Sequence, residues 1–152
     1  MGESKSLSIQ LVNQLNIEYT LAHLYKERAG QERDPIIKVL YVMIANDSLN
    51  HLDLVKYAIN MIGGEVPKPT LMKVSGYDPS AMKTEESLIN EIDIGLEEME
   101  AASMVHFGVL AEKFYDARYS DLFRAVQEDE AVHQKILRAI RSHRKGKTRE
   151  PV

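Results

Sequence analysis

The chain has 152 residues, which suits one domain, and a formal net charge of −4 from 19 basic and 23 acidic side chains. It has no cysteine, which excludes disulfides, thiol nucleophiles and cysteine-ligated zinc or iron–sulfur sites. The acidic balance argues against nucleic acid as a partner, and no apolar run reaches the ~18 residues of a membrane span. The first residues lack the apolar stretch of a signal peptide, so we expect a cytoplasmic protein without a membrane partner.

Helical periodicity covers most of the chain, and no strand pattern competes with it. Apolar residues recur at steps of three and four, which places them on one face of a helix. Asp34 and Pro35 are favoured at the start of a helix, and Gly63 and Gly64 are typical of a helix end. The sequence therefore predicts an all-α fold with helices at about 6–29, 35–62, 85–117 and 121–143.

Residues 65–84 contain three of the five prolines and are expected to form an irregular crossover. Twenty extended residues can span ~66 Å, whereas a 26-residue helix is only ~39 Å long. The crossover can therefore run the length of a bundle and start the third helix parallel to the second. The predicted architecture is a single domain over 1–152, built from two antiparallel helical hairpins joined by this crossover. The basic segment 144–152 is expected to be a mobile tail.

Polar side chains interrupt the inward stripes of all four predicted helices near their middles. Buried charges are costly unless they are paired or bound to metal. Carboxylates can bridge two cations, and imidazoles supply nitrogen ligands that suit iron, zinc or manganese. The sequence therefore predicts a metal centre inside the bundle, and its candidate ligands are Glu18, Asp47, His51, Glu97, Glu130 and His133.

Three segments resemble the ferritin-like di-iron carboxylate proteins, especially bacterioferritins and the helical domain of rubrerythrins. These segments are Asn13–Tyr25, Asp93–Glu97 and Glu128–His133, and the resemblance extends over about residues 6–143. The family pattern is a Glu from each of two helices and Glu-x-x-His from each of the other two. The resemblance implies a ferritin-like bundle that binds iron, normally a di-iron centre, and forms a homo-oligomer, a dimer or larger. It also implies a ferroxidase or an oxidase that reduces dioxygen or peroxide.

The resemblance assigns the ligands to two ions. Glu18 and His51 would hold one ion, Glu97 and His133 the other, and Glu130 would bridge them. One departure affects this assignment, because Ser48 stands where the pattern has a bridging Glu, three residues before His51. Asp47 is the alternative source of that carboxylate; without it the centre would be asymmetric or mononuclear. The methionine that binds haem in bacterioferritins is missing beside this position, so no haem is expected.

Several alternatives stay open at this point. Glu97 lies in an acidic run, and such a run is usually a solvated helix face. Asp47 and His51 could form a buried pair without metal, and Tyr25 could either support a ligand or be a core aromatic residue. The functional alternatives to an oxidase are an iron-storage shell and a non-catalytic four-helix scaffold, and manganese or zinc could replace iron.

Overall fold

The computed structural model describes residues 2–73, 85–114 and 116–149, and within them the side chains of residues 6–73, 92–114 and 116–144. Four helices make up the described structure, and these residues contain no strand. The prediction of an all-α bundle is confirmed. The helices are α1 (Gly2–Gln31), α2 (Pro35–Met61), α3 (Glu85–Lys113) and α4 (Ala117–Arg149).

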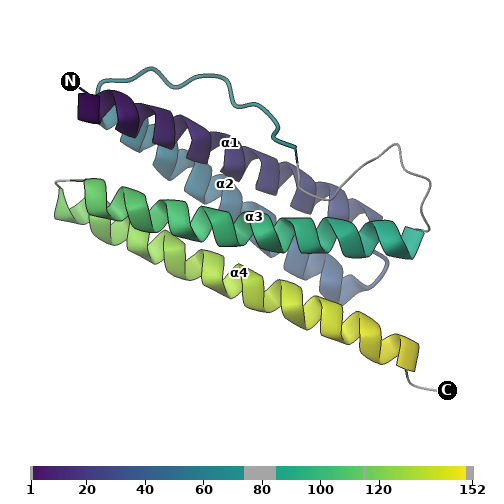
Figure 1. Cartoon of the computed structure of the whole chain (residues 1–152). Helices are drawn as coiled ribbons and strands as arrows, with labels where there is room; N and C mark the ends of the chain where they lie inside the picture. Colours follow the sequence, from purple (N-terminus) through teal and green to yellow (C-terminus); the bar gives the residue numbers. More distant parts are fainter. Residues whose placement is uncertain (1, 74–84, 115, 150–152) are drawn as a thin grey trace.

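The helices form two antiparallel hairpins that lie side by side (Figure 1). The pairs α1–α2 and α3–α4 pack extensively, and α1 also packs against α3 and α2 against α4. Helix α3 runs in the same direction as α2, as the predicted crossover requires (Figure 1).

The first part of the crossover is fixed against α1 by two backbone hydrogen bonds. The amide of Thr70 donates to Asn16 Oδ1 at 3.0 Å, and the amide of Met72 donates to Thr20 Oγ1 at 2.8 Å. The chain therefore advances along α1 in the direction of that helix. Residues 74–84 of the predicted crossover lie outside the described residues.

Helix α2 begins and ends where the sequence predicts. Asp34 Oδ1 accepts hydrogen bonds from the amides of Ile36 at 3.0 Å and Ile37 at 3.5 Å, which satisfies donors of the first turn. Pro35 occupies the first turn, where its missing N–H costs nothing. At the other end Gly63 has a φ of +79°, a left-handed conformation that glycine adopts readily.

Helix α4 differs from the prediction, because it continues to Arg149 instead of ending near residue 143. The Arg144 side chain donates to Asp93 Oδ2 at 2.7 Å and to the Tyr41 hydroxyl at 3.1 Å, and it also pairs with Glu32. These contacts hold α4 at residue 144 against α2, α3 and the loop between α1 and α2. Charge alone had assigned residue 144 to a solvated tail. Residues 150–152 lie outside the described residues.

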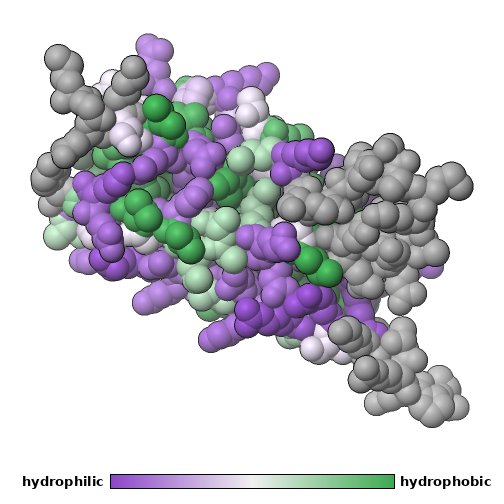
Figure 2. Space-filling model, viewed as in Figure 1, coloured by the Kyte–Doolittle hydropathy of each residue, from purple (hydrophilic) through white to green (hydrophobic). Residues whose placement is uncertain are grey.

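Two apolar clusters fill the interior, one toward each end of the bundle. The outer face is mixed, with hydrophilic side chains interspersed among apolar ones (Figure 2). Burial of one Leu, Ile, Val or Phe side chain in these clusters contributes ~1.5–3 kcal/mol to the free energy of folding. The first cluster includes Leu11, Leu15, Val55, Phe107 and Phe123, and the second includes Ile17, Leu21, Ile44, Leu96 and Leu137. On α2, α3 and α4 an interval without cluster residues separates the two sets, and on α1 the two sets meet at Leu15 and Ile17, next to Glu18. The polar site lies at this level of the bundle.

Candidate metal centre

The interval between the apolar clusters contains five buried carboxylate and imidazole side chains. Every helix contributes at least one of them from its inward face, and all five lie at the same height along the bundle. Their exposed fractions range from 0 to 4%. They are Glu18 from α1, His51 from α2, Glu100 from α3, and Glu130 and His133 from α4.

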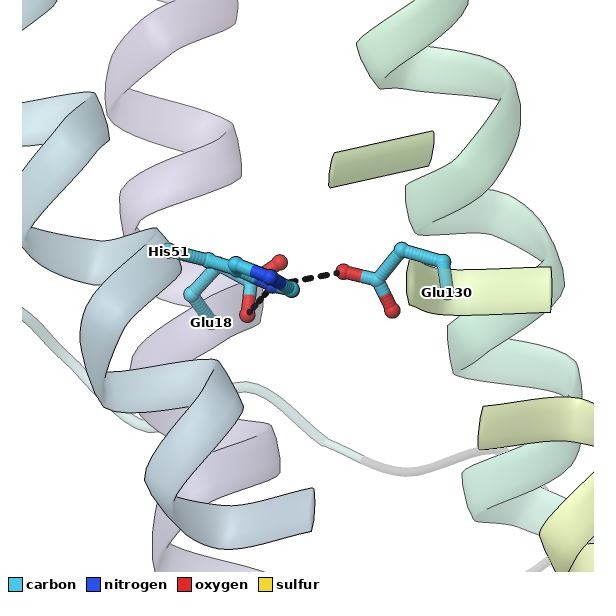
Figure 3. Close-up of side chains that lie close together, drawn as sticks. All are labelled: Glu18, His51 and Glu130. Atoms are coloured by element: carbon cyan, nitrogen blue, oxygen red, sulfur yellow. Dashed lines mark ion pairs between the residues drawn. The ribbon is translucent and has the colours of Figure 1, made fainter. Parts of the chain in front are cut away.

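The first group of ligand-competent atoms lies between α1, α2 and α4. The ring of His51 points between the two carboxylates of Glu18 and Glu130 (Figure 3). Its Nδ1 lies 3.6 Å from Glu18 Oε2 and 3.3 Å from Glu130 Oε1.

The second group lies between α3 and α4. His133 Nδ1 is 3.2 Å from Glu100 Oε1 and 3.7 Å from Glu130 Oε2. Glu130 therefore belongs to both groups, with Oε1 directed to His51 and Oε2 directed to His133. One carboxylate with its two oxygens in two adjacent groups has the arrangement of a bridging ligand.

The donor atoms of both groups fit a divalent metal ion. In each group the three donor atoms lie within 4.8 Å of one another. Atoms bound to one ion at ~2.1 Å are at most ~4.2 Å apart, so small side-chain rotations would close either set. Within the described part of the chain, Glu18 Oε2, His51 Nδ1, Glu100 Oε2 and Glu130 Oε2 are buried without a hydrogen-bond partner. Buried polar atoms normally have partners, and a cation would supply them here.

The outer nitrogens of both imidazoles are bonded to carboxylates at the surface. His51 Nε2 donates to Asp129 Oδ2 at 3.0 Å, and His133 Nε2 donates to Asp47 Oδ2 at 2.9 Å. The two pairs are reciprocal, because Asp47 precedes His51 on α2 but bonds the histidine of α4, and Asp129 does the converse. Such pairs fix the imidazole tautomer and leave Nδ1 as the inward ligand atom.

Three neutral side chains form hydrogen bonds around the Oε1 atoms of the three carboxylates. Tyr25 donates its hydroxyl to Glu100 Oε1 at 2.9 Å. Ser103 Oγ lies 3.2 Å from both Glu18 Oε1 and Glu130 Oε1, and Gln14 Nε2 donates to Ser103 Oγ at 2.8 Å. These contacts orient the carboxylates before any ion binds.

Without metal, protons compensate the charges of this cluster. Burial, together with the negative charge of Glu130, raises the pKa of Glu18. Burial opposes ionisation of Glu130 too, but the close contacts of its carboxylate with His133, His51 and Glu18 lower its pKa. Burial lowers the pKa of His51, yet its contacts with Glu130 and Glu18 outweigh that effect and raise the pKa to about 10. In the metal-free cluster, burial therefore favours the protonated form of Glu18, and the two carboxylates favour the cationic form of His51.

Four of the six predicted ligands, Glu18, His51, Glu130 and His133, are brought together. The structure does not bring Glu97 to them. Its carboxylate pairs instead with Arg138 at 3.1 Å and Arg141 at 2.6 Å. The side chain of Asp47 is half exposed and lies on the outer side of His133, outside both groups.

Sequence reasoning missed Glu100, the carboxylate that α3 brings to the centre. The predicted stripe of this helix was offset by one residue, because two stripes with equally regular steps were available. The buried stripe carries the larger apolar side chains, and that was the missed signal. Its members are Asp93, Leu96, Glu100, Ser103, Phe107 and Leu110.

The fold and the site define a class, that of four-helix bundles with a buried carboxylate–histidine cluster suited to metal ions. The rubrerythrin family model matches residues 11–141, and the chain belongs to that family. Among solved structures, the chain is similar to the crystal structure of ferritin-like, diiron-carboxylate proteins from Bacillus anthracis strain Ames. The two share 16% identity with a TM-score of 0.69, over 92% of this chain and 98% of the other.

This similarity confirms the predicted ferritin-like fold. No curated protein sequence matches the chain significantly. Within its described residues, none of the four helices combines the length and apolar character that crossing a membrane requires.

Proposed function

We propose that this protein binds two divalent metal ions, iron before manganese or zinc, and oxidises ferrous iron with peroxide or dioxygen. The observation that carries the proposal is the position of Glu130, whose two oxygens face two separate buried groups. Glu18 and His51 complete the first ion's ligands, and Glu100 and His133 complete those of the second. Glu100 takes the role that the sequence had assigned to Glu97.

Iron supplies the electrons of the reaction, since two ferrous ions provide the two electrons that convert one peroxide and two protons into two waters. The protein holds the ligand side chains in position and excludes water from them. Apolar clusters on both sides keep the ligands away from solvent, and hydrogen bonds from Tyr25 and Ser103 hold two of the carboxylates in place. The imidazoles are held by Asp47 and Asp129, so little reorganisation accompanies loading.

The test is an anaerobic peroxide titration of protein loaded with ferrous iron, followed by ferric absorbance. We expect two irons to be oxidised per peroxide and per chain. Glu130→Gln removes the shared ligand and should abolish the protein-dependent oxidation. Glu128→Gln is the matched control, because Glu128 is exposed two residues away on the same helix. Oxidation that is equal in Glu130→Gln and the wild type would contradict the proposal.

Ser48 favours a second candidate, a four-helix scaffold that binds metal without turnover. This residue leaves α2 with one ligand, His51, where α4 has two. Stoichiometric metal binding with no peroxide-dependent oxidation would support the scaffold. An iron-storage shell requires the same oxidation plus a closed assembly; light scattering would distinguish such a shell from a dimer.

A further inference from the structure

Ser48 occupies the position that corresponds to Glu130 in the other half of the molecule. Helix α4 carries Asp129-Glu130 followed by His133, and α2 carries Asp47-Ser48 followed by His51, at the same spacing. The reciprocal contacts of Asp47 with His133 and of Asp129 with His51 show that the structure follows this internal symmetry. Only one of the two corresponding positions therefore provides a carboxylate.

The side chain of Ser48 is directed to the interior. It is fully buried, and it lies one turn before His51, on the same helix face. Its Oγ has no hydrogen-bond partner among the described residues. A buried hydroxyl without a partner is costly, and it can donate to an acceptor that enters beside it.

The metal-loaded centre would carry one unbalanced positive charge. Three buried carboxylates, those of Glu18, Glu100 and Glu130, face two divalent ions, which gives four positive charges against three negative ones. Asp47 and Asp129 are half exposed, so solvent screens them. A buried excess charge is unfavourable, and a single monoanion would neutralise it.

We propose that a small monocarboxylate binds beside Ser48 and takes the place of the missing bridge between the two metal ions. A serine side chain ends at Oγ, whereas a glutamate continues from the equivalent atom into a carboxylate group, and formate consists of such a group. Its oxygens would coordinate the two ions, and the Ser48 hydroxyl would donate a hydrogen bond to it. This inference rests on the proposed metal centre.

Formate is the probe, with protein loaded with Co²⁺ so that a bound anion is detected through paramagnetic broadening of the ¹³C-formate signal. We expect saturable binding with a Kd on the order of 1 mM, about the tightest that so small a ligand reaches. Equal concentrations of sodium chloride give the baseline. Ser48→Ala keeps the space but removes the donor, and should weaken formate binding about tenfold.

Ser48→Glu provides the missing carboxylate as a side chain. It should therefore abolish formate binding and raise the affinity for the second Co²⁺ ion. Asn50→Glu is the matched control, because it adds a carboxylate on the exposed face of the same helix and should bind formate like the wild type. Two bound Co²⁺ ions without saturable formate binding, or formate binding that Ser48→Glu leaves unchanged, would overturn this inference and leave the metal centre intact. Failure to retain Co²⁺ would overturn the proposed function itself.

Discussion

Glu97 and Glu100 lie one turn apart on α3, and the structure assigns them different roles. Glu100 is fully buried beside His133 and Tyr25, whereas Glu97 pairs with Arg138 and Arg141 near the surface. Glu100→Gln keeps the volume of the side chain and an oxygen that accepts from Tyr25, so the metal-free protein should keep its stability. The substitution removes a charged ligand of one ion, however. The affinity for that ion should fall by at least ~100-fold, which is the upper end of the loss found when a residue that only supports a ligand is mutated.

A 100-fold loss of affinity corresponds to about 2.7 kcal/mol less stabilisation by metal at a saturating concentration. For a chain of this size, that is a loss of about 5–10 °C in the metal-induced rise of Tm. Scanning calorimetry with and without Zn²⁺ measures this rise. Glu97→Gln removes two partly exposed ion pairs that lie away from the metal ligands, and it should leave the metal-induced rise unchanged. A metal-induced rise that Glu97→Gln reduces as much as Glu100→Gln would refute the assignment.

Three further predictions concern neighbouring groups. Tyr25→Phe removes the hydrogen bond to Glu100 while keeping the ring, and should weaken metal binding ~10-fold by isothermal titration. Metal binding at pH 7 must displace protons from Glu18, whose pKa is raised, and from His51, whose pKa is about 10. The apparent affinity should therefore rise from pH 6 to pH 8, and calorimetry in two buffers should detect release of one proton from each; an affinity independent of pH would contradict this. Asp93→Ala removes the fully buried carboxylate that pairs with Arg28 and Arg144 and leaves Arg28 with the carboxylate of Glu32, so it should cost ~3–5 kcal/mol in urea unfolding; a loss below 1 kcal/mol would contradict that role.

The fold was largely readable from the sequence because its determinants are local. The N-cap at Asp34, the glycine at position 63 and the proline-containing crossover set the helix boundaries through short-range chemistry. The end of α4 was not readable in this way. Arg144 is held by Asp93 and Glu32, which are remote in sequence, and a basic residue near a terminus carries no sign of such partners.

The site was readable to the extent that helical phase was unambiguous. The burial of Glu130 and His133 was predictable because apolar residues fix the phase of α4. On α2 the predicted stripe included His51, which is buried, but also Asp47, which is half exposed next to the buried Ser48. On α3 the acidic run offered a carboxylate on either of two adjacent stripes, and only packing against α1 and α4 selects Glu100. The bonds from the two surface aspartates to the opposite histidines also depend on how helices α2 and α4 face each other, which sequence spacing does not specify.

The proposed function depends on Glu130 as the ligand that two metal positions share. The most direct measurement is the metal content per chain, after anaerobic ferrous loading and removal of free iron, for the wild type and for Glu130→Gln. We expect near two equivalents of iron in the wild type, a loss of both in Glu130→Gln, and two equivalents in the Glu128→Gln control. No retained iron in the wild type, or two equivalents retained by Glu130→Gln, would contradict the proposed function.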